Sequence, residues 1–392
     1  MITEISGGQR RRQGHACSAD VVIVGGGPTG LAAAIALRQA GADVLIADAQ
    51  EPPIDKACGE GLMPDSLREL SRLGIDLAEV AGTPFHGIRF ADRHSTVSAG
   101  FTDGGGLGVR RLALHRQLLD RATAMGVRMR WKAKVELRPG ERPTLGGEPL
   151  CYSYLIGADG GSSRTRAWAA LNAGVLRSRR FGFRAHFEFD CQSETYPGSS
   201  YVEVHWGDGG QAYVTPVGER QVCVAVVSHL RSPKTFNSVI DSIPTLRASL
   251  SRARQITPQR GAVTTTSSFH RVTRGNVALL GDASGTADAI TGEGLAMGFR
   301  QALLLSDSIA EGGLERYQAQ HGDILRLPQQ MARVMLLMDR HPRLRARILA
   351  AFATRPDLFA MMLRVHLNEE RLPSVVLRHG AEFGRLLLSS AG

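Results

Sequence analysis

The chain has 392 residues, of which 43% are apolar and 21% charged, a balance typical of globular proteins that excludes disorder on a large scale. A single core stops growing at roughly 250–300 residues, so this length predicts two interleaved domains and a tail. The net charge of +10 comes mostly from scattered arginines, with one dense run at 10–12, and this distribution argues against a nucleic-acid partner.

The cysteine and hydropathy patterns predict a cytoplasmic protein. The five cysteines are far apart and lack CxxC spacing, which argues against a disulfide framework and against a metal site. No run approaches the roughly 18 apolar residues of a membrane span, so we expect no integral membrane segment. Residues 1–18 lack both periodicity and the apolar core of a signal peptide, and we expect a flexible leader there.

The first structured segment is predicted to be a βαβ unit. Residues 21–24 form a continuous apolar strand, 30–40 an Ala/Leu-rich helix, and 43–48 a second strand. The turn between the first strand and the helix contains a GxGxxG motif, made of Gly25, Gly27, Pro28, Thr29 and Gly30 with Gly26.

Each position of this motif has a physical task in binding a dinucleotide. Gly25 permits the tight turn, Gly27 lets the backbone approach a pyrophosphate, and Gly30 lets helix and strand pack closely. The helix N-terminus then binds phosphate. Asp48, about 20 residues further on, is placed to accept hydrogen bonds from the adenosine ribose, and an acid there disfavours a 2′-phosphate. Strand, motif, helix and acid together predict a dinucleotide-binding unit.

A proline-rich loop at 51–64 follows, and it contains Cys58. Two interpretations stay open, a plain connection with a buried cysteine and a functional loop stiffened by its prolines. Beyond the loop, the pattern predicts a helix near 65–73, short strands over 83–104, a helix that opens at Arg111, and an alternating strand over 127–135.

Two more strands end on acidic turns. Residues 152–157 lead into Asp159-Gly160, where both a cofactor contact and a purely structural turn are open. Residues 276–280 end on Gly281-Asp282, and an ionised Asp at a strand end can accept hydrogen bonds from sugar or ribityl hydroxyls.

A glycine-led helix start comes after the third strand end, with the sequence Gly292-Glu293-Gly294-Leu295. A helix that opens near Gly294 directs unpaired N–H groups and the positive end of its dipole at whatever lies before it. A reduced flavin carries negative charge on its pyrimidine side, so this segment favours a flavin. The alternative is an ordinary strand, loop and helix with a solvent-exposed Asp.

From residue 181 to 228 the period changes to two, which predicts an antiparallel sheet that covers the flavin and holds substrate. Beyond about residue 322 the apolar spacing is helical, through 328–338, 343–354 and 356–367. The predicted fold class is α/β: a Rossmann-like FAD-binding domain with a parallel sheet, interleaved with an antiparallel-sheet substrate domain, and a C-terminal helical region. The predicted boundaries are 19–80, 105–178 and 270–320 for the FAD-binding domain, 81–104 and 179–269 for the substrate domain, and 321–392 for the helices.

Three motifs occur in a specific order along the chain: GxGxxG at 25–30, Asp159-Gly160-x-x-Ser163-x-x-Arg166, and Gly281-Asp282. Together they resemble the flavoprotein superfamily of p-hydroxybenzoate hydroxylase, which includes class A monooxygenases, flavin halogenases and geranylgeranyl reductases. The resemblance covers residues 20–320. It implies FAD as the cofactor, NADPH or NADH as the electron donor, and a small-molecule substrate.

The resemblance also implies roles for single residues. The first motif would grip the FAD pyrophosphate, and Asp159-Gly160 would lie where flavin and pyridine nucleotide contacts meet. The other implied contacts are Asp48 with the adenosine ribose, Arg111 with the phosphates, the Val135 backbone with adenine, Asp282 with the ribityl chain, and Gly292 to Leu295 with the flavin pyrimidine edge. For Arg111 a surface salt bridge is the alternative.

Two activities stay open within the superfamily. A monooxygenase would hydroxylate or epoxidise a hydrophobic, aromatic or polycyclic molecule through a C4a-hydroperoxyflavin, and we prefer it because this activity is commoner and the aromatic strand of the reductases is missing at 211–216. A C=C reductase is the second candidate, because Gly292-Glu293-Gly294 and the loop around Cys58 resemble geranylgeranyl reductases, where Cys58 would supply a proton. The halogenase Trp-x-Trp signature is absent. A non-catalytic flavin-binding protein is the third hypothesis.

Overall fold

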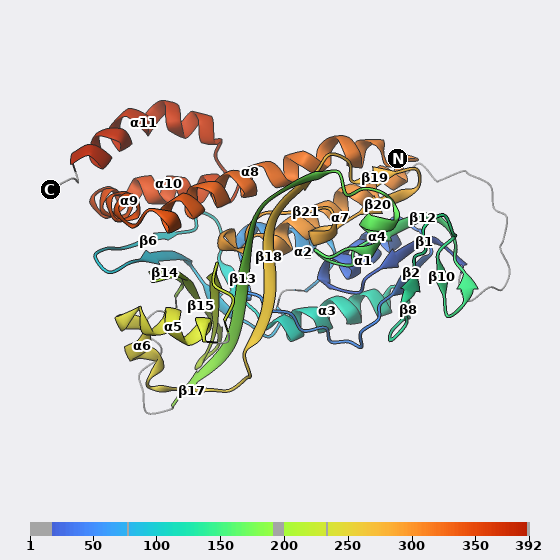
Figure 1. Ribbon diagram of the computed structural model, residues 1–392, viewed down its shortest axis with the longest axis horizontal. Helices are drawn as coiled ribbons and strands as arrows, with labels where there is room; N and C mark the ends of the chain where they lie inside the picture. Colours follow the sequence, from blue (N-terminus) through green and yellow to red (C-terminus); the bar gives the residue numbers. More distant parts are fainter. Residues whose placement is uncertain (1–17, 77, 191–199, 233, 390–392) are drawn as a thin grey trace.

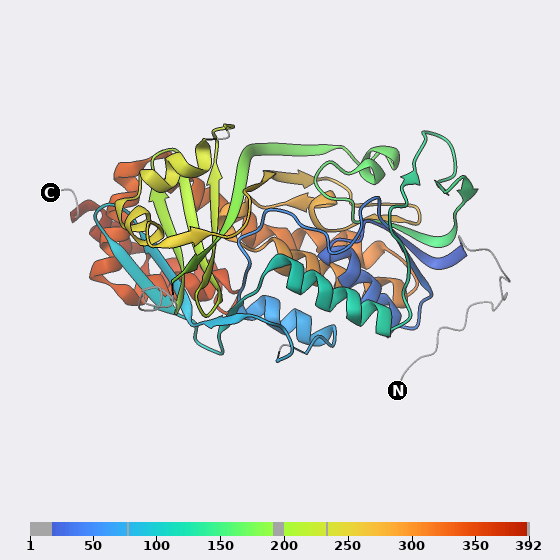
Figure 2. The ribbon, with the colours of Figure 1, turned by 90° about the horizontal axis from the view of Figure 1, so that it is seen from below.

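The computed structural model describes residues 18–76, 78–190, 200–232 and 234–389. The leader predicted at 1–18 therefore lies outside the described residues, except for Ser18, which begins the first strand. Figures 1 and 2 show an elongated molecule, with a parallel sheet at one end and the C-terminal helices at the other.

Six strands form the parallel sheet, in the order β19-β20-β12-β1-β2-β8, and only β19 runs antiparallel to its neighbour. The strands are β1 (Ser18–Val24), β2 (Val44–Ala47), β8 (Arg128–Arg130), β12 (Cys151–Gly157), β19 (Thr273–Arg274) and β20 (Val277–Leu279). Helix α1 (Pro28–Gln39) packs against α3 (Arg111–Ala124) and α7 (Gly294–Ala310). The central strands are buried on both faces, as their continuous apolar sequences require. The predicted fold class is thus confirmed at this end of the molecule.

A large, mostly antiparallel sheet has the order β21-β18-β13-β16-β15-β14-β5-β6, with β17 beside β13. Its strands are β5 (Gly87–Ala91), β6 (Thr96–Gly100), β13 (Gly174–Phe189), β14 (Tyr201–Gly207), β15 (Gly210–Gly218), β16 (Gln221–Ser228), β17 (Ala253–Gln255), β18 (Arg260–Phe269) and β21 (Gly285–Thr286). Strand β5 pairs with β14 in parallel, which brings the segment 81–104 onto the same sheet as 179–269. Strand β13 runs across the boundary predicted between 178 and 179.

The alternation along this sheet sends its side chains to two different cores. Val214 and Val224 pack under helices α5 (Thr235–Asp241) and α6 (Pro244–Leu250). Tyr213, Ala225 and Val227 belong to the other cluster, which the C-terminal helices share. One face of the sheet is therefore a floor on which those helices can close a cavity.

Four helices form the C-terminal region: α8 (Glu315–Arg340), α9 (Pro342–Thr354), α10 (Pro356–His366) and α11 (Leu372–Ser389). Two features differ from the sequence expectation. Helix α8 continues through Pro328, which we predicted as a helix start, and Pro328 is buried there. Helix α11 lies within the predicted helical region, but no separate helix was assigned there, since Gly380 and Gly384 weaken its intrinsic propensity; packing of Val375 and Phe383 on the helical core stabilises it.

Shorter elements complete the chain and carry parts of the site. They are β3 (Gly61–Leu62), α2 (Pro64–Arg72), β4 (Thr83–Phe85), β7 (Gly106–Gly108), β9 (Val135–Glu136), β10 (Thr144–Leu145), β11 (Glu148–Pro149), α4 (Arg164–Trp168), η1 (Gly281–Ala283) and η2 (Ala289–Thr291).

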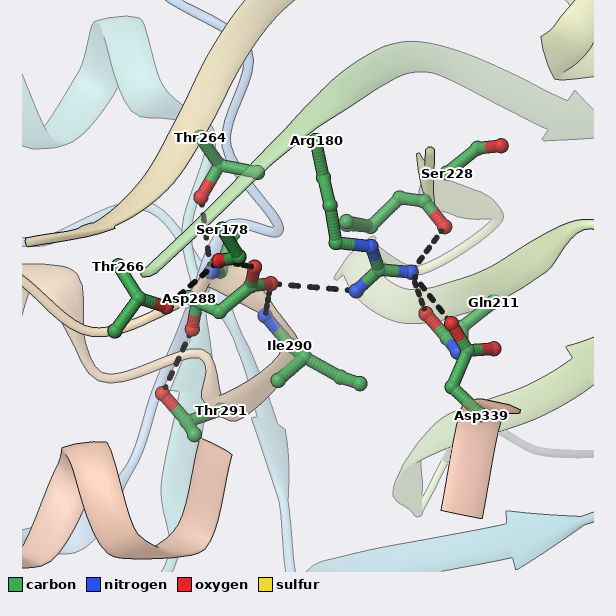
Figure 3. A network of polar contacts seen from close by, with 12 residues as sticks. Ser178, Arg180, Gln211, Ser228, Thr264, Thr266, Asp288, Ile290, Thr291 and Asp339 are labelled. Atoms are coloured by element: carbon green, nitrogen blue, oxygen red, sulfur yellow. Dashed lines mark hydrogen bonds and ion pairs between the residues drawn. The ribbon is translucent and has the colours of Figure 1, made fainter. Parts of the chain in front are cut away.

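A buried arginine joins η2, α8 and the antiparallel sheet, as Figure 3 shows. Arg180, on β13, lies 3.3 Å from the Asp288 carboxylate, which caps η2, and 3.3 Å from the Asp339 carboxylate on α8. The same guanidinium donates to the Gln211 side chain at 2.5 Å and to the Val227 carbonyl oxygen at 3.1 Å. Burial raises the pKa of Asp339, and the charge of Arg180 opposes that shift. This network fixes η2 and α8 relative to the sheet.

We expect Arg180→Leu to lower the free energy of unfolding by about 3–5 kcal/mol, because it leaves the Asp288 carboxylate buried without its partner. Chemical denaturation of the wild type and the variant measures this change. The matched control is Arg179→Leu, an exposed neighbour that we expect to change stability by less than about 0.5 kcal/mol. Equal effects of the two substitutions would show that the buried network contributes nothing specific.

Candidate functional site

One continuous cavity of about 1390 Å³ lies between the two sheets and the C-terminal helices. Fourteen of the sixteen residues predicted to bind the cofactor line it; they are Gly25, Gly27, Pro28, Thr29, Asp48, Arg111, Val135, Asp159, Gly160, Gly281, Asp282, Gly292, Gly294 and Leu295. The two others, Gly30 and Glu293, lie behind its wall. The fold thus gathers these dispersed segments around one space.

The glycine motif has the geometry that a close backbone approach requires. Gly25 has a φ of +113°, and a Cβ there would lie 2.4 Å from the Ala158 carbonyl oxygen. A Cβ on Gly30 would lie 2.0 Å from the Gly25 carbonyl oxygen, so Gly30 serves packing and not the cavity. A Cβ on Gly27 would meet nothing within 4 Å and would enter the cavity. No side chain caps α1, so its first N–H groups are available to a phosphate.

Asp48 and His115 stabilise this turn from two sides. The Asp48 carboxylate accepts hydrogen bonds from the Gly26 and Gln50 backbone N–H groups, both at 2.7 Å, while still lining the cavity. The His115 Nε2 lies 2.9 Å from the Gly26 carbonyl oxygen, and burial lowers the pKa of His115. A neutral imidazole therefore donates to the turn. His115 was not identified from the sequence, where only its place on the predicted helix was visible.

Arg111 is the first residue of α3 and faces the cavity. Its buried Nε has no hydrogen-bond partner among the described residues. A guanidinium with an unpaired donor, lining the same cavity as Gly27, suits a phosphate group. The predicted phosphate role stays a prediction, and the Arg111 side chain makes no ion pair within the described residues.

The Asp159 carboxylate is engaged within its own turn. It accepts from the Arg164 N–H at 2.8 Å, from the Thr165 N–H at 3.0 Å and from the Ser163 hydroxyl at 2.5 Å, and so holds the start of α4. Arg166 then links this turn to η1, donating to the Ala283 carbonyl oxygen at 2.9 Å. These contacts are those of a structural turn, the alternative to a cofactor contact that the sequence left open for Asp159.

Asp282 lies in η1, just after β20, and pairs with Lys56. The Lys56 Nζ lies 2.7 Å from its Oδ2, and both side chains are about 40% exposed at the cavity. The neighbouring Gly281 N–H donates to the Gln301 side chain at 2.7 Å, and Gln301 in turn contacts His321 at 3.3 Å. The loop at 51–64 and the third strand end therefore meet at one point, although 226 residues separate the ion pair.

Helix α7 begins at Gly294, as predicted, but the Glu293 side chain beside it is turned away from the cavity. Gly292 has a φ of +73° and ends η2, and no side chain caps α7. Its backbone can therefore present N–H groups to the cavity, which Gly292, Gly294 and Leu295 line. The Glu293 carboxylate is buried outside the cavity, 3.7 Å from His366 Nδ1, and burial raises its pKa.

A buried polar cluster, of which Glu60 lines the cavity, was missed from the sequence. Glu60, His186 and Cys223 bring their ligand-type atoms within 4.8 Å of one another, a spacing that a metal ion could use. The Cys223 thiol also donates to the Cys58 carbonyl oxygen at 3.5 Å. The signal for this cluster was weak, because the three residues come from separate segments with no ligand spacing.

The hydrogen bonds of His186 argue against a metal there. Its Nδ1 faces donors from Arg184 at 3.3 Å, Arg110 at 3.4 Å and the Thr257 hydroxyl at 2.9 Å, so this nitrogen accepts. The ring proton is then on Nε2, which donates to Glu60 at 2.7 Å. A metal ion could bind only by displacing this proton and breaking the pair with Glu60. The cluster instead anchors the loop that carries Cys58 to the antiparallel sheet.

The comparison with known protein families agrees with this geometry. Residues 18–312 match the family model described as an FAD binding domain. The chain belongs to this FAD-binding family. It is an FAD-dependent oxidoreductase of the p-hydroxybenzoate hydroxylase-like superfamily, as the strand-end motifs predicted.

Similar proteins include both reductases and hydroxylases. A menaquinone reductase of Mycolicibacterium smegmatis is 26% identical over 77% of this chain and 78% of its own length. An FAD-dependent urate hydroxylase of Klebsiella oxytoca is 25% identical over 78% of this chain and 86% of its own. The solved flavoprotein/dehydrogenase of Cytophaga hutchinsonii has a TM-score of 0.80 and 16% identity, covering 95% of this chain and all of that one, which shows the fold alone. None of the helices described in our structure has the length and apolar character to cross a membrane.

Gly27→Ala and Gly30→Ala should separate cofactor binding from folding. We expect Gly27→Ala to keep the thermal stability of the FAD-free protein and to raise the Kd for FAD by about tenfold or more, because its methyl group enters the cavity. Gly30→Ala should lower the stability of the FAD-free protein, because its Cβ collides with the Gly25 carbonyl. Calorimetry of the FAD-free protein and fluorescence titration with FAD measure the two effects. An unchanged FAD affinity in Gly27→Ala would contradict the placement of the pyrophosphate.

Acid should destabilise this protein through His321, which supports η1. Burial lowers the pKa of His321 from 6.5 to about 4. The unfolded state therefore binds the proton first as the pH falls from about 6.5 to 4, and stability falls in that window by up to about 3 kcal/mol. Denaturation across this range should give a flatter profile for His321→Gln than for wild type. The exposed control His94→Gln should keep the wild-type slope, and a matching slope in His321→Gln would contradict the assignment.

Proposed function

We propose that this protein is an NAD(P)H-dependent FAD monooxygenase that acts on a hydrophobic molecule with an aromatic or polycyclic head and a long apolar part. The observation that carries the proposal is the far end of the cavity, beyond the residues predicted to hold FAD. Apolar side chains from four helices line it: Met331, Met335, Met338, Phe352, Phe359 and Phe383. A polar substrate would find few partners at this end.

The chain's own residues have separable tasks in this proposal. Arg111 and the start of α1 would hold the FAD phosphates, Asp282 the ribityl chain, and the start of α7 the negative charge of the reduced ring. When bound, FAD supplies the redox chemistry. The protein contributes position and the exclusion of water.

The wall facing the flavin end is apolar where it is formed by the antiparallel sheet. Val202, Val204, Ala225 and Val227 line the cavity there, and Tyr213 donates its hydroxyl to the Ile290 carbonyl oxygen at 2.8 Å. Burial raises the pKa of Tyr213, so that its hydroxyl stays neutral. Such a wall excludes water from the reacting atoms, as oxygen transfer to an organic substrate requires.

A C=C reductase is the second candidate, and the position of Cys58 favours it. Cys58 lines the cavity, and its Sγ accepts a hydrogen bond from the Glu60 N–H at 3.4 Å. A thiol at this place could give a proton to a carbon that receives hydride. The similarity to a menaquinone reductase over most of the chain supports a reductase.

Product mass separates the two activities. We expect anaerobically purified, FAD-loaded protein with NADPH or NADH to consume O₂ together with the substrate, and to add one oxygen atom to an alkyl-substituted phenol. Oxygen uptake and mass spectrometry with ¹⁸O₂ measure this. Addition of two hydrogen atoms to a polyene without O₂ uptake would replace the monooxygenase with the reductase.

Cys58→Ala tests the same choice inside the protein. For the monooxygenase we expect the rate of product formation to change by less than about tenfold, because no proton from Cys58 is needed. For the reductase we expect a loss of about 10²-fold or more in kcat, the usual contribution of a general acid. Cys151→Ala is the matched control, since Cys151 lies on β12 and does not line the cavity.

A further inference from the structure

We propose that the C-terminal helices form a docking surface for an anionic lipid bilayer, which places the apolar end of the cavity at the membrane. The proposal rests on the proposed function in one respect: a long apolar substrate would partition into a membrane. The surface itself is inferred from exposure and charge. We call it the C-terminal surface; it comprises the exposed residues of α8, α9 and α11 together with Arg371, which directly precedes α11.

Four of the exposed large apolar side chains lie on two helices of this surface. Val334 and Leu337 on α8 are 45% and 47% exposed, and Val376 and Leu377 on α11 are 58% and 88% exposed. Val334 and Val376 also line the cavity. A side chain that is both exposed and cavity-lining marks a mouth, so the apolar end of the cavity opens between α8 and α11.

The C-terminal helical region that contains this mouth is strongly positive. Residues 321–392 contain eleven arginines, no lysine and six acidic residues, so this fifth of the chain carries +5, half of the total +10. Five of the six acids are in ion pairs. Six exposed arginines have no ion pair among the described residues; they are Arg333, Arg340, Arg343, Arg347, Arg371 and Arg385.

This combination fits a lipid surface better than another polyanion. Unpaired arginines attract anionic headgroups, while an exposed leucine at the same place can enter the boundary of the acyl chains. A nucleic acid would gain from the arginines but not from Leu377 or from an apolar cavity mouth beside them. Because the surface and the mouth share Val376, a substrate could leave the bilayer without crossing water.

Vesicle sedimentation tests the proposal without substrate or NAD(P)H, so its failure is separate from failure of the proposed activity. We expect the FAD-loaded full chain to sediment with vesicles of phosphatidylcholine mixed with phosphatidylglycerol, and much less with phosphatidylcholine alone or at high salt. The double variant Arg371→Gln/Arg385→Gln should weaken binding by at least roughly tenfold. Leu377→Ser should weaken vesicle binding by roughly tenfold, because the variant lacks the leucine side chain whose transfer from water into the bilayer favours binding.

Two matched controls lie outside the C-terminal surface. Leu230→Ser removes another half-exposed leucine, and Arg116→Gln removes another exposed arginine on α3. Both should keep wild-type binding, and FAD absorbance should show that all variants are folded and loaded. The proposal is overturned if wild type binds neither vesicle, if the C-terminal variants bind as well as the controls, or if a DNA oligonucleotide binds while anionic vesicles do not.

Discussion

The site depends on one constraint, the parallel pairing of β1 with β2 on one side and β12 on the other. Parallel neighbours end at the same edge of a sheet, and β20 joins this edge through β12. Gly25, Asp48, Asp159 and Asp282 follow the ends of these four strands, and all four line one cavity. If β1 were displaced by one position in the sheet, the phosphate-binding turn and the acidic strand ends would no longer face a common ligand.

A second layer of contacts holds the loop at 51–64 over this edge. The loop contacts the third strand end through Lys56 and the antiparallel sheet through Glu60, which His186 and the Arg111 N–H both reach. Glu60 keeps a φ of +59°, unusual for a residue with a side chain, and these contacts offset its backbone strain. Cys58 is thus positioned by residues that need not touch any substrate.

The strand, turn and helix of the dinucleotide-binding part could be predicted from sequence, whereas the FAD contacts of its single residues stay predictions. GxGxxG and the acid at Asp48 act through local geometry, a strand, a turn and a helix that are continuous in the chain. The role of Asp159 could not be decided in this way, because its competing partners, the N–H groups of Arg164 and Thr165, exist only once α4 has formed. Glu293 had the right place in the motif, but the direction of its side chain depends on packing against His366.

Short windows of sequence predict the FAD cofactor, the two kinds of sheet and the helical end, because each follows from periodicity or from strand-end chemistry. The reach of the cavity beneath α8 to α11, the Lys56–Asp282 pair and the Arg180 network become visible only in the folded chain. These features join side chains that lie far apart in the chain, 226 residues for Lys56 and Asp282 and 159 for Arg180 and Asp339. No local pattern encodes such a contact, since its energy arises only when distant segments bury the same polar groups together.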